Sequence, residues 1–302
     1  MKAVMLASQS IQMGIRNVII AGGMESMSNV PHYSFMRKST SYGDAKLIDG
    51  IARDGLVDAY NNKPMGFCNE KTNKDLNLSR LEIDEYCKRS YKLADESNKV
   101  KRYSDEIVPV EVQWRNGTVT IIKDEEPPKY DEGKVSKLKP AFDKDGKNTP
   151  ANSSKISDGA CTLVLMEEVF AKSNGFESLA RIISYEDAEV EPIDFSISPG
   201  KCVSALLKRV GLTVADIDYF EINEAFSSVV LANVKLLGID LSKVNLRGGA
   251  VSLGHPIGMS GARIILNLVS VLKEKNWRYG IASICNGGGG SSAILVENIK
   301  SI

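Results

Sequence analysis

The stretch Ser283-Ile284-Cys285-Asn286-Gly287-Gly288-Gly289-Gly290 decides how this chain folds and where its chemistry lies. It follows the turn Gly254-His255-Pro256 and the segment Asn223-Glu224-Ala225-Phe226. Together these segments hold one of the five cysteines and one of the two histidines in the chain. Glycines beside a thiol let backbone N–H groups approach a ligand closely, and an imidazole on a turn can move protons. The three segments therefore mark a candidate catalytic site.

Composition narrows the class of protein. The chain has 302 residues, of which 43% are hydrophobic and 25% charged, with zero net charge. Neutral charge gives no reason to expect nucleic acid or an anionic membrane surface as a partner. No apolar run reaches the roughly 18 residues of a membrane-spanning helix, and the first residues resemble neither a secretion signal nor a transit peptide. Five cysteines without CxxC spacing indicate intracellular thiols, not a disulfide framework or a zinc site.

The first part of the chain reads as a helix, a strand and a long insertion. Met1, Val4, Met5, Ser8 and Ile11 share one helical face, and residues 17–21 read as a buried strand that ends in a tight loop over residues 22–26. The polar region from about 30 to 150 looks like an insertion between two core elements. Within it, a Ser79–Glu82 capping box predicts a helix over 80–100, and alternation around Asn116-Gly117 predicts a hairpin over 108–121.

Strands and helices alternate after residue 158, which favours an α/β layered fold with a mostly parallel sheet. Strands are expected at 159–165, 179–186, 217–222, 243–247, 279–285 and 290–296, with helices at 199–210, 225–237 and 258–274. Residues 1–23 also match residues 262–288 as helix, strand and glycines, which indicates a duplicated fold. The expected division is an incomplete first half over 1–168, with its insertion at about 30–150, and a second half over 178–302.

The first half is expected to be incomplete at its start, without opening strands of its own. This expectation has a physical consequence. We expect that half to present an unpaired sheet edge and an uncovered apolar face, which favour association between chains. The chain alone is therefore expected to be poorly soluble or oligomeric.

Each motif has a plainer interpretation. The glycines of 248–261 fit neither the dinucleotide-binding nor the phosphate-loop pattern, so a nucleotide-binding module is a remote alternative. Asn223-Glu224 after a strand could simply start a helix. Cys68, Cys87, Cys161 and Cys202 are expected to be small buried side chains.

Taken together, the motifs strongly resemble the thiolase family, over nearly the whole chain. The resemblance rests on four segments: Asn223–Phe226, Gly248–Arg263, Cys285–Gly290 and residues 21–31, AGGMESMSNVP. These segments are similar to the acetoacetyl-CoA thiolase branch and its mitochondrial member. The resemblance implies a thiolase fold of duplicated α-β-α-β-α halves with an inserted loop domain. It also implies acetyl-CoA C-acetyltransferase activity, in which two acetyl-CoA molecules condense or acetoacetyl-CoA is cleaved.

The resemblance assigns catalytic roles. His255 matches the base that activates the acylated cysteine, Cys285 the thiol that moves the α-proton of acetyl-CoA, and Asn223 the residue that holds a water in an oxyanion hole. In the family the acylated cysteine lies in a Cys-Ala-Ser-Gly run immediately before the Met-Lys-Ala with which this sequence starts. We therefore expect residues 1–302 to lack the nucleophile and to be inactive alone.

Coenzyme A, as substrate, and a potassium ion are the ligands implied. The residues that match coenzyme A contacts are Tyr91, Lys129, Tyr130, Asp131, Lys134 and Ser154. The residues that match a potassium site built mainly from carbonyl oxygens are Tyr91, Pro150, Ala151, Ser153 and Val251. Four positions depart from the family pattern: Lys129 replaces arginine, Pro64 replaces the histidine of a His-Met-Gly run, and Pro150 and Ser153 replace alanine.

The resemblance further implies a mitochondrial homotetramer in fatty acid, ketone-body and isoleucine metabolism. The rival interpretation is a noncatalytic thiolase fragment or pseudoenzyme that binds coenzyme A or a partner subunit. The sequence leaves open linear against 2-methyl-branched substrates, and condensation against cleavage.

Overall fold

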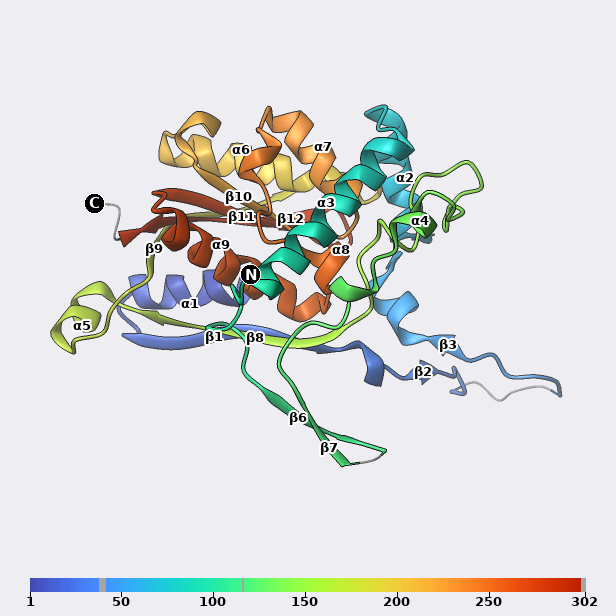
Figure 1. Ribbon diagram of the computed structural model, residues 1–302, viewed down its shortest axis with the longest axis horizontal. Coiled ribbons are helices and arrows are strands. Elements are labelled where there is room, and N and C mark those ends of the chain that lie inside the picture. Colours follow the sequence, from blue (N-terminus) through green and yellow to red (C-terminus); the bar gives the residue numbers. More distant parts are fainter. Residues whose placement is uncertain (38–41, 116, 300–302) are drawn as a thin grey trace.

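Two helices lie between two β-sheets and carry the architecture (Figure 1). The computed structural model describes residues 1–37, 42–115 and 117–299. Helices α1 (Lys2–Gln12) and α9 (Ile257–Lys275) form the middle layer, and their apolar faces pack on both sheets. Helix α6 (Ser198–Val210) covers the far face of the larger sheet, and α7 (Ser227–Leu237) packs against α6. This layering confirms the α/β prediction.

The larger sheet is mixed, which corrects the prediction of a mostly parallel sheet. Its order is β10 (Tyr219–Ile222), β11 (Tyr279–Cys285), β12 (Gly290–Asn298) and β9 (Ala180–Glu189). Only β10 and β11 are parallel, because a helical crossover joins them. The turn 286–289 between β11 and β12 is too short for a crossover, so those strands must run antiparallel.

The smaller sheet pairs two strands that lie far apart in the sequence. Strand β1 (Val18–Ser26) pairs antiparallel with β8 (Asp158–Met166) along its whole length, from Val18↔Met166 to Ser26↔Asp158. The two core strands are therefore adjacent in space although a long segment separates them in sequence. The tight loop expected at 22–26 is wrong, since β1 continues through it. Gly23 serves a different purpose, because a side chain there would overlap the Gly258 carbonyl at the start of α9.

The internal repeat is visible in the topology. The succession α1, β1, β8 matches α9, β11, β12: a helix, a strand, then an antiparallel partner. The insertion thus occupies the place that the short turn 286–289 takes in the second half.

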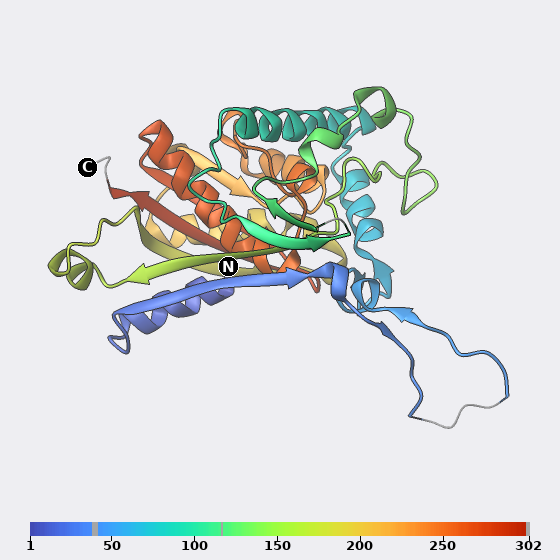
Figure 2. The same ribbon diagram turned by 60° about the horizontal axis from the view of Figure 1, so that its bottom comes forward.

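Within the insertion, helices α2 (Met65–Asp75) and α3 (Arg80–Lys99) pack against α7. The predicted capping box is present at Ser79 and Glu82. The predicted hairpin is confirmed as β6 (Val110–Trp114) and β7 (Gly117–Ile121), although Asn116 lies outside the described residues. Figure 2 shows the segment that carries β2 (His32–Tyr33) and β3 (Ile48–Asp49) extending away from the layers.

The remaining short elements of the chain are β4 (Val57–Asp58), β5 (Lys63–Pro64), α4 (Glu132–Val135), α5 (Glu168–Ser173) and α8 (Ala250–Leu253).

The predicted strand at 243–247 is wrong as a regular element. Val244 makes one isolated bridge to Phe220, and Asn245 then adopts a left-handed conformation with φ 46°. That conformation ends an extended run. The Asn245 side chain compensates, since it donates to the Ile222 carbonyl at 2.8 Å and accepts from the Ile222 N–H at 2.9 Å. It thereby ties this loop to the end of β10.

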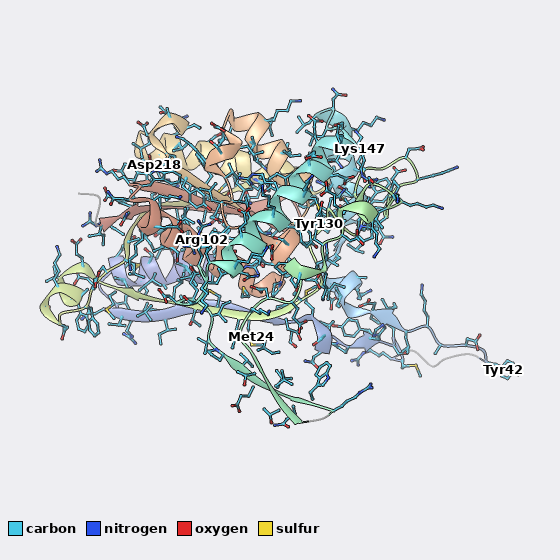
Figure 3. The ribbon with its side chains drawn as sticks, in the orientation of Figure 1. Met24, Tyr42, Arg102, Tyr130, Lys147 and Asp218 are labelled. Atoms are coloured by element: carbon cyan, nitrogen blue, oxygen red, sulfur yellow. The ribbon has the colours of Figure 1, made fainter. Side chains whose placement is uncertain are left out.

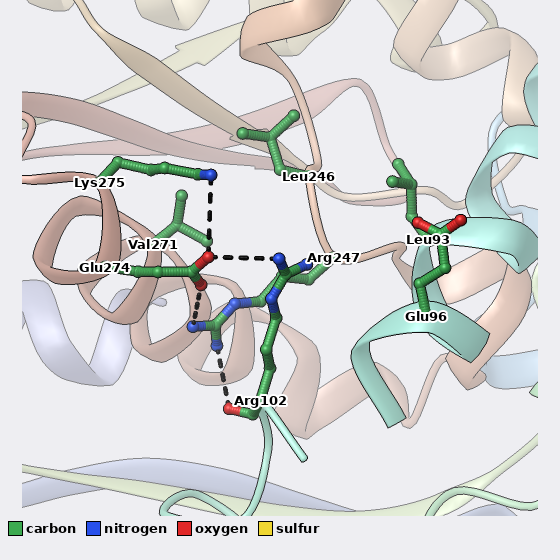
Figure 4. Close-up of a pocket in the computed structure, with 8 residues that line it drawn as sticks. All are labelled: Leu93, Glu96, Arg102, Leu246, Arg247, Val271, Glu274 and Lys275. Atoms are coloured by element: carbon green, nitrogen blue, oxygen red, sulfur yellow. Dashed lines mark hydrogen bonds and ion pairs between the residues drawn. The ribbon is translucent and has the colours of Figure 1, made fainter. Parts of the chain in front are cut away.

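Arg247 anchors the far end of α9 to the insertion (Figure 4). Its guanidinium, only 6% exposed, pairs with Glu106 at 2.7 Å and Glu274 at 3.1 Å. Arg247 and Glu274 border a cavity of about 250 Å³ between the C-terminal ends of α3 and α9. It shares no lining residue with the cavity that holds His255 and Cys285.

The outer face of the smaller sheet is apolar and exposed, as predicted. Ile20, Met24 and Val164 are each at least 60% exposed, and Figure 3 shows Met24 on the side of β1 away from the helices. Over the described residues no helix combines the length and the hydropathy needed to span a membrane. No cluster of three or more His, Cys, Asp or Glu residues suited to a metal ion occurs in the same residues.

Hydrogen exchange should distinguish the two sheets. Among the described strands β1 pairs only with β8, whereas β10 and β11 are buried under helices on both faces. We expect amide exchange in β10 and β11 to be at least tenfold slower than in β1, because opening the smaller sheet exposes less apolar surface. Equal protection in both sheets would contradict this account of the first half.

Candidate active site

One cavity of about 410 Å³ gathers the sequence motifs. The N-terminal ends of α1 and α9 open into it, together with the end of β11 and the loop that follows. His255 and Cys285 both line it, although thirty residues separate them. Its lining residues are Met1, Lys2, Gly55, Leu56, Met65, Ser154, Phe195, Ala225, Phe226, His255, Ile257, Gly258, Gly261, Ile284, Cys285, Asn286, Gly287 and Ser292. The cavity is thus an apolar chamber with few polar groups, as ligand sites commonly are.

His255 is held from three sides. Its backbone N–H donates to the Lys155 carbonyl at 2.9 Å, and its Nδ1 lies 2.6 Å from the Ser260 hydroxyl. Ser260 donates to the Pro256 carbonyl at 2.9 Å, so the proton between ring and hydroxyl belongs to Nδ1. Nε2 is then an acceptor, and the Asn223 amide donates to it at 3.1 Å. This tautomer leaves Nε2 available as a base.

The environment keeps the His255 ring neutral. Burial, and to a smaller extent the nearby Arg263 cation, lower its pKa from 6.5 to about 3. Arg263 is itself fixed by donating to the Gly254 carbonyl at 2.7 Å. Above that pH the ring is neutral, and the Nε2 lone pair is free to accept a hydrogen bond or a proton.

Nitrogen NMR of histidine-labelled protein should show this neutrality directly. The His255 ring signal is expected to keep its neutral chemical shift as the pH falls from 8 to 5, because its pKa lies near 3. The variant His255→Asn assigns the signal. A protonation midpoint between pH 6 and 7 would contradict the buried environment described here.

Cys285 ends β11 and is 9% exposed. Burial raises the pKa of its thiol to about 12, so it rests as a protonated thiol. The other thiols resemble it, since burial raises the pKa of Cys87 and Cys202 to about 12. Burial also raises the pKa of Cys68 and Cys161 above its ordinary value. Each of the five cysteines therefore lacks the lowered pKa of a resting nucleophile.

Glycines allow the loop after Cys285 to fold back. Gly288 and Gly289 have φ of 85° and 87°, which favour glycine. At Gly289 a side chain would also overlap the Val190 carbonyl. The loop closes when Asn286 N–H donates to the Gly290 carbonyl at 2.9 Å, which fixes the backbone beside the thiol.

Asn223 and Glu224 do not start a helix, which corrects the plainer interpretation of that segment, because α7 begins only at Ser227. Asn223 N–H donates to the Ser283 carbonyl at 3.0 Å, and its buried Oδ1 has no protein partner, which suits a bound water. Glu224 is buried and accepts from Tyr86 at 2.8 Å and Ser90 at 2.7 Å, both on α3. It therefore joins the insertion to the catalytic loop.

The residues expected to contact coenzyme A do not all lie at the cavity, and Tyr91 among them is buried. Ser154 lines the cavity, and Tyr91 stacks on Tyr130 with ring centroids 4.8 Å apart. Two lysines lie outside it, where Lys129 pairs with Glu126 and Lys134 pairs with Asp131. The structure thus brings Ser154 to the catalytic groups and leaves the charged residues exposed.

The residues expected to bind potassium do gather, but a side chain lies among them. The Lys155 ammonium donates to the carbonyls of Pro150 at 2.7 Å, Ala151 at 3.1 Å and Ser153 at 2.7 Å. Tyr91 and Val251 pack beside Ala151. Three of the expected carbonyl ligands already accept from a cation, so the residues as they lie do not fit a potassium ion at that point.

Sequence reasoning did not assign four residues that shape the site. They are Lys155, Glu224, Ser260 and Arg263, and each acts by holding another residue. Ser260 lies on the first turn of α9, beside the His255-Pro256 turn, so its position was a usable signal. Glu224 acts across segments distant in sequence, because its partners Tyr86 and Ser90 lie on α3. Arg263 and Lys155 hold carbonyls of their own loops, and these contacts depend on how each loop folds.

Comparison with known proteins agrees with this geometry. The model of the thiolase N-terminal domain matches residues 1–169, and that of the thiolase C-terminal domain matches residues 176–298. The chain belongs to the thiolase family. Among similar members, an acetyl-CoA acetyltransferase of Yarrowia lipolytica is 53% identical over 302 residues, which cover 100% of this chain and 75% of that protein. The human mitochondrial acetyl-CoA acetyltransferase is 52% identical over 301 residues, which cover 99% of this chain and 70% of that thiolase.

Solved thiolase structures share the fold. A thiolase from Ascaris suum in complex with coenzyme A aligns with a TM-score of 0.93 at 44% identity, over 99% of this chain and 76% of that one. Human mitochondrial 3-ketoacyl-CoA thiolase aligns with a TM-score of 0.94 at 35% identity, over 98% of this chain and 76% of that one. The thiolase fold expected from the motifs is therefore confirmed.

Proposed function

We propose that this thiolase has acetyl-CoA C-acetyltransferase chemistry. The observation that carries the proposal is that the neutral His255, the protonated Cys285 thiol and the N-terminal end of α1 line one cavity. These groups are a base, an acid and an electrostatically positive helix end. The names of the relatives support the same activity.

In cleavage, a cysteine thiol gives its proton to His255 Nε2 and attacks the 3-keto carbon of acetoacetyl-CoA. The bond between C2 and C3 breaks, and the leaving enolate takes the proton of Cys285 to become acetyl-CoA. Free coenzyme A then gives its thiol proton to the Cys285 thiolate, and its sulfur attacks the acetyl carbonyl. The bond between the acetyl group and the enzyme cysteine breaks, and the released thiolate takes its proton back from His255. Condensation follows the reverse course. A water on Asn223 and the His255 ring are placed to donate to the enolate oxygen.

We propose that the acylated cysteine is none of the five in residues 1–302. All five thiols have raised pKa values, and Cys285 is suited to proton transfer. The N-terminal end of α1 lies in the cavity at Met1 and Lys2. A cysteine there would gain a lowered pKa from the helix dipole. The family resemblance places the Cys-Ala-Ser-Gly run at that end, so residues 1–302 alone are proposed to be inactive.

Coenzyme A is proposed to enter past Ser154, with its acyl group among Leu56, Met65, Phe226 and Ile284. The Ascaris suum complex supports this ligand. Lys129 and Lys134 are exposed and paired only with neighbouring carboxylates, so both can turn toward phosphates. Mitochondrial localisation and a homotetramer are proposed from the resemblance.

Potassium has no part in the reaction proposed here, because Lys155 holds the carbonyls expected to bind it.

Turnover separates this proposal from its rival, a noncatalytic protein that binds coenzyme A or a partner. The test uses a form extended before Met1 by the corresponding segment of the Yarrowia lipolytica relative. Acetoacetyl-CoA thiolysis by that form, followed through loss of enolate absorbance, would support the enzyme. Binding of coenzyme A by calorimetry without any turnover would support the rival.

A further inference from the structure

The loop 150–155 curls around the end of its own lysine side chain. Three carbonyl oxygens, those of Pro150, Ala151 and Ser153, lie 2.7 to 3.1 Å from Lys155 Nζ. An ammonium has three N–H donors and no acceptor, so the three carbonyls satisfy it completely. The Tyr91 ring lies 5.7 Å from the same nitrogen and presents a further site attractive to a cation.

Carbonyl oxygens that converge on one point repel one another unless a cation lies between them. In this loop the cation is covalently attached, two residues from the last carbonyl. Nothing in the sequence between Pro150 and Ser153 supplies charge, because Ala151, Asn152 and Ser153 are neutral. Without Lys155 the same three dipoles would need a free cation of similar size.

The loop touches both catalytic segments. Ser154 N–H donates to the Ala225 carbonyl at 3.0 Å, and Ser227 N–H donates to the Asn152 carbonyl at 2.9 Å, so the loop runs along the chain just after Asn223. The Lys155 carbonyl accepts from the His255 N–H at 2.9 Å. The shape of this loop therefore helps to set the positions of His255 and Asn223.

We propose that Lys155 is a tethered monovalent cation, which fills the carbonyl cluster of Pro150, Ala151 and Ser153 and makes this protein independent of added potassium. Lys155 is then a positioning residue, since it reaches the reacting atoms only through His255 and the 223–227 segment. The expected effect of Lys155 on the stability of the fold does not depend on the proposed function. Its expected effect on turnover rests on the proposed function.

Thermal unfolding of residues 1–302 tests the proposal without any turnover. The variant Lys155→Met keeps the length of the side chain and removes its charge. Lys172→Met is the matched control, because Lys172 is exposed and pairs with Glu168 on α5. Each protein is melted in choline, sodium, potassium and ammonium chloride at equal ionic strength.

The parent and Lys172→Met should have the same Tm in all four salts. Lys155→Met should lose roughly 2–8 °C in choline chloride. Potassium or ammonium ions, but not choline, should restore most of that loss. A parent that is itself stabilised selectively by potassium would overturn the proposal, as would a Lys155→Met variant without any selective response.

Two further measurements keep the proposal falsifiable if Lys155→Met does not fold. Crystals of the parent soaked in rubidium chloride should show no anomalous peak among the three carbonyls, and a peak there would overturn the proposal. In the extended form, the parent should have the same kcat in sodium chloride and in potassium chloride. A parent kcat that depends on potassium would overturn the proposal. Lys155→Met should there lose roughly 10- to 100-fold in kcat in choline and regain it with potassium.

Discussion

Replacing His255 with alanine is expected to lower the kcat of acetoacetyl-CoA thiolysis at least 100-fold in the form extended before Met1. His255 lines the same cavity as the N-terminal end of α1. In the proposed mechanism its neutral ring takes the thiol proton, and the protonated ring then donates to the enolate oxygen. The measurement is the initial rate of loss of enolate absorbance at saturating acetoacetyl-CoA and coenzyme A.

His32→Ala is the matched control, because His32 is the only other histidine and lies on the surface. It should leave kcat unchanged. Ser260→Ala removes the hydroxyl that fixes the His255 ring at 2.6 Å, so an intermediate loss of about tenfold is expected. A loss below tenfold for His255→Ala would reject its role as the base.

The second large effect is an absence of turnover. Residues 1–302 alone are expected to show no thiolysis above a buffer blank, because each of the five thiols is held protonated by burial. The extended form should turn over on the scale of a working enzyme, roughly 1 s⁻¹ or faster. Circular dichroism of both forms controls for folding. Turnover by residues 1–302 that disappears in Cys285→Ser would contradict this expectation and show that Cys285 can act as the nucleophile.

The sequence predicted the layers well because their signals are local. Helical periodicity in residues 1–11 and the alternation around Asn116-Gly117 both correspond to elements that form where they were expected. The parallel sheet was wrong because strand direction depends on connection length, and the turn 286–289 forces β11 and β12 to be antiparallel. The loop at 22–26 was wrong because its glycines allow close packing, Gly23 on α9 and Gly22 on the backbone of β8, and do not turn the chain.

The site shows the same division. Asn223, His255 and Cys285 each lie in a short motif at the end of a core element, and the structure brings all three segments together. Their catalytic roles stay predictions. Lys155 was not predictable as a cation, because its role depends on how the loop 150–155 curls. Glu224 also gave no local signal, since its partners Tyr86 and Ser90 come from the insertion.

The measurement closest to the central claim is the location of the acetyl group during the reaction. The extended form and residues 1–302 are each mixed with acetyl-CoA, quenched in acid and analysed by peptide mass spectrometry. The account predicts an acetyl thioester on the cysteine of the segment before Met1 and none on Cys285 in either form. An acetyl thioester on Cys285 of residues 1–302 would contradict its assignment as the proton-transfer thiol.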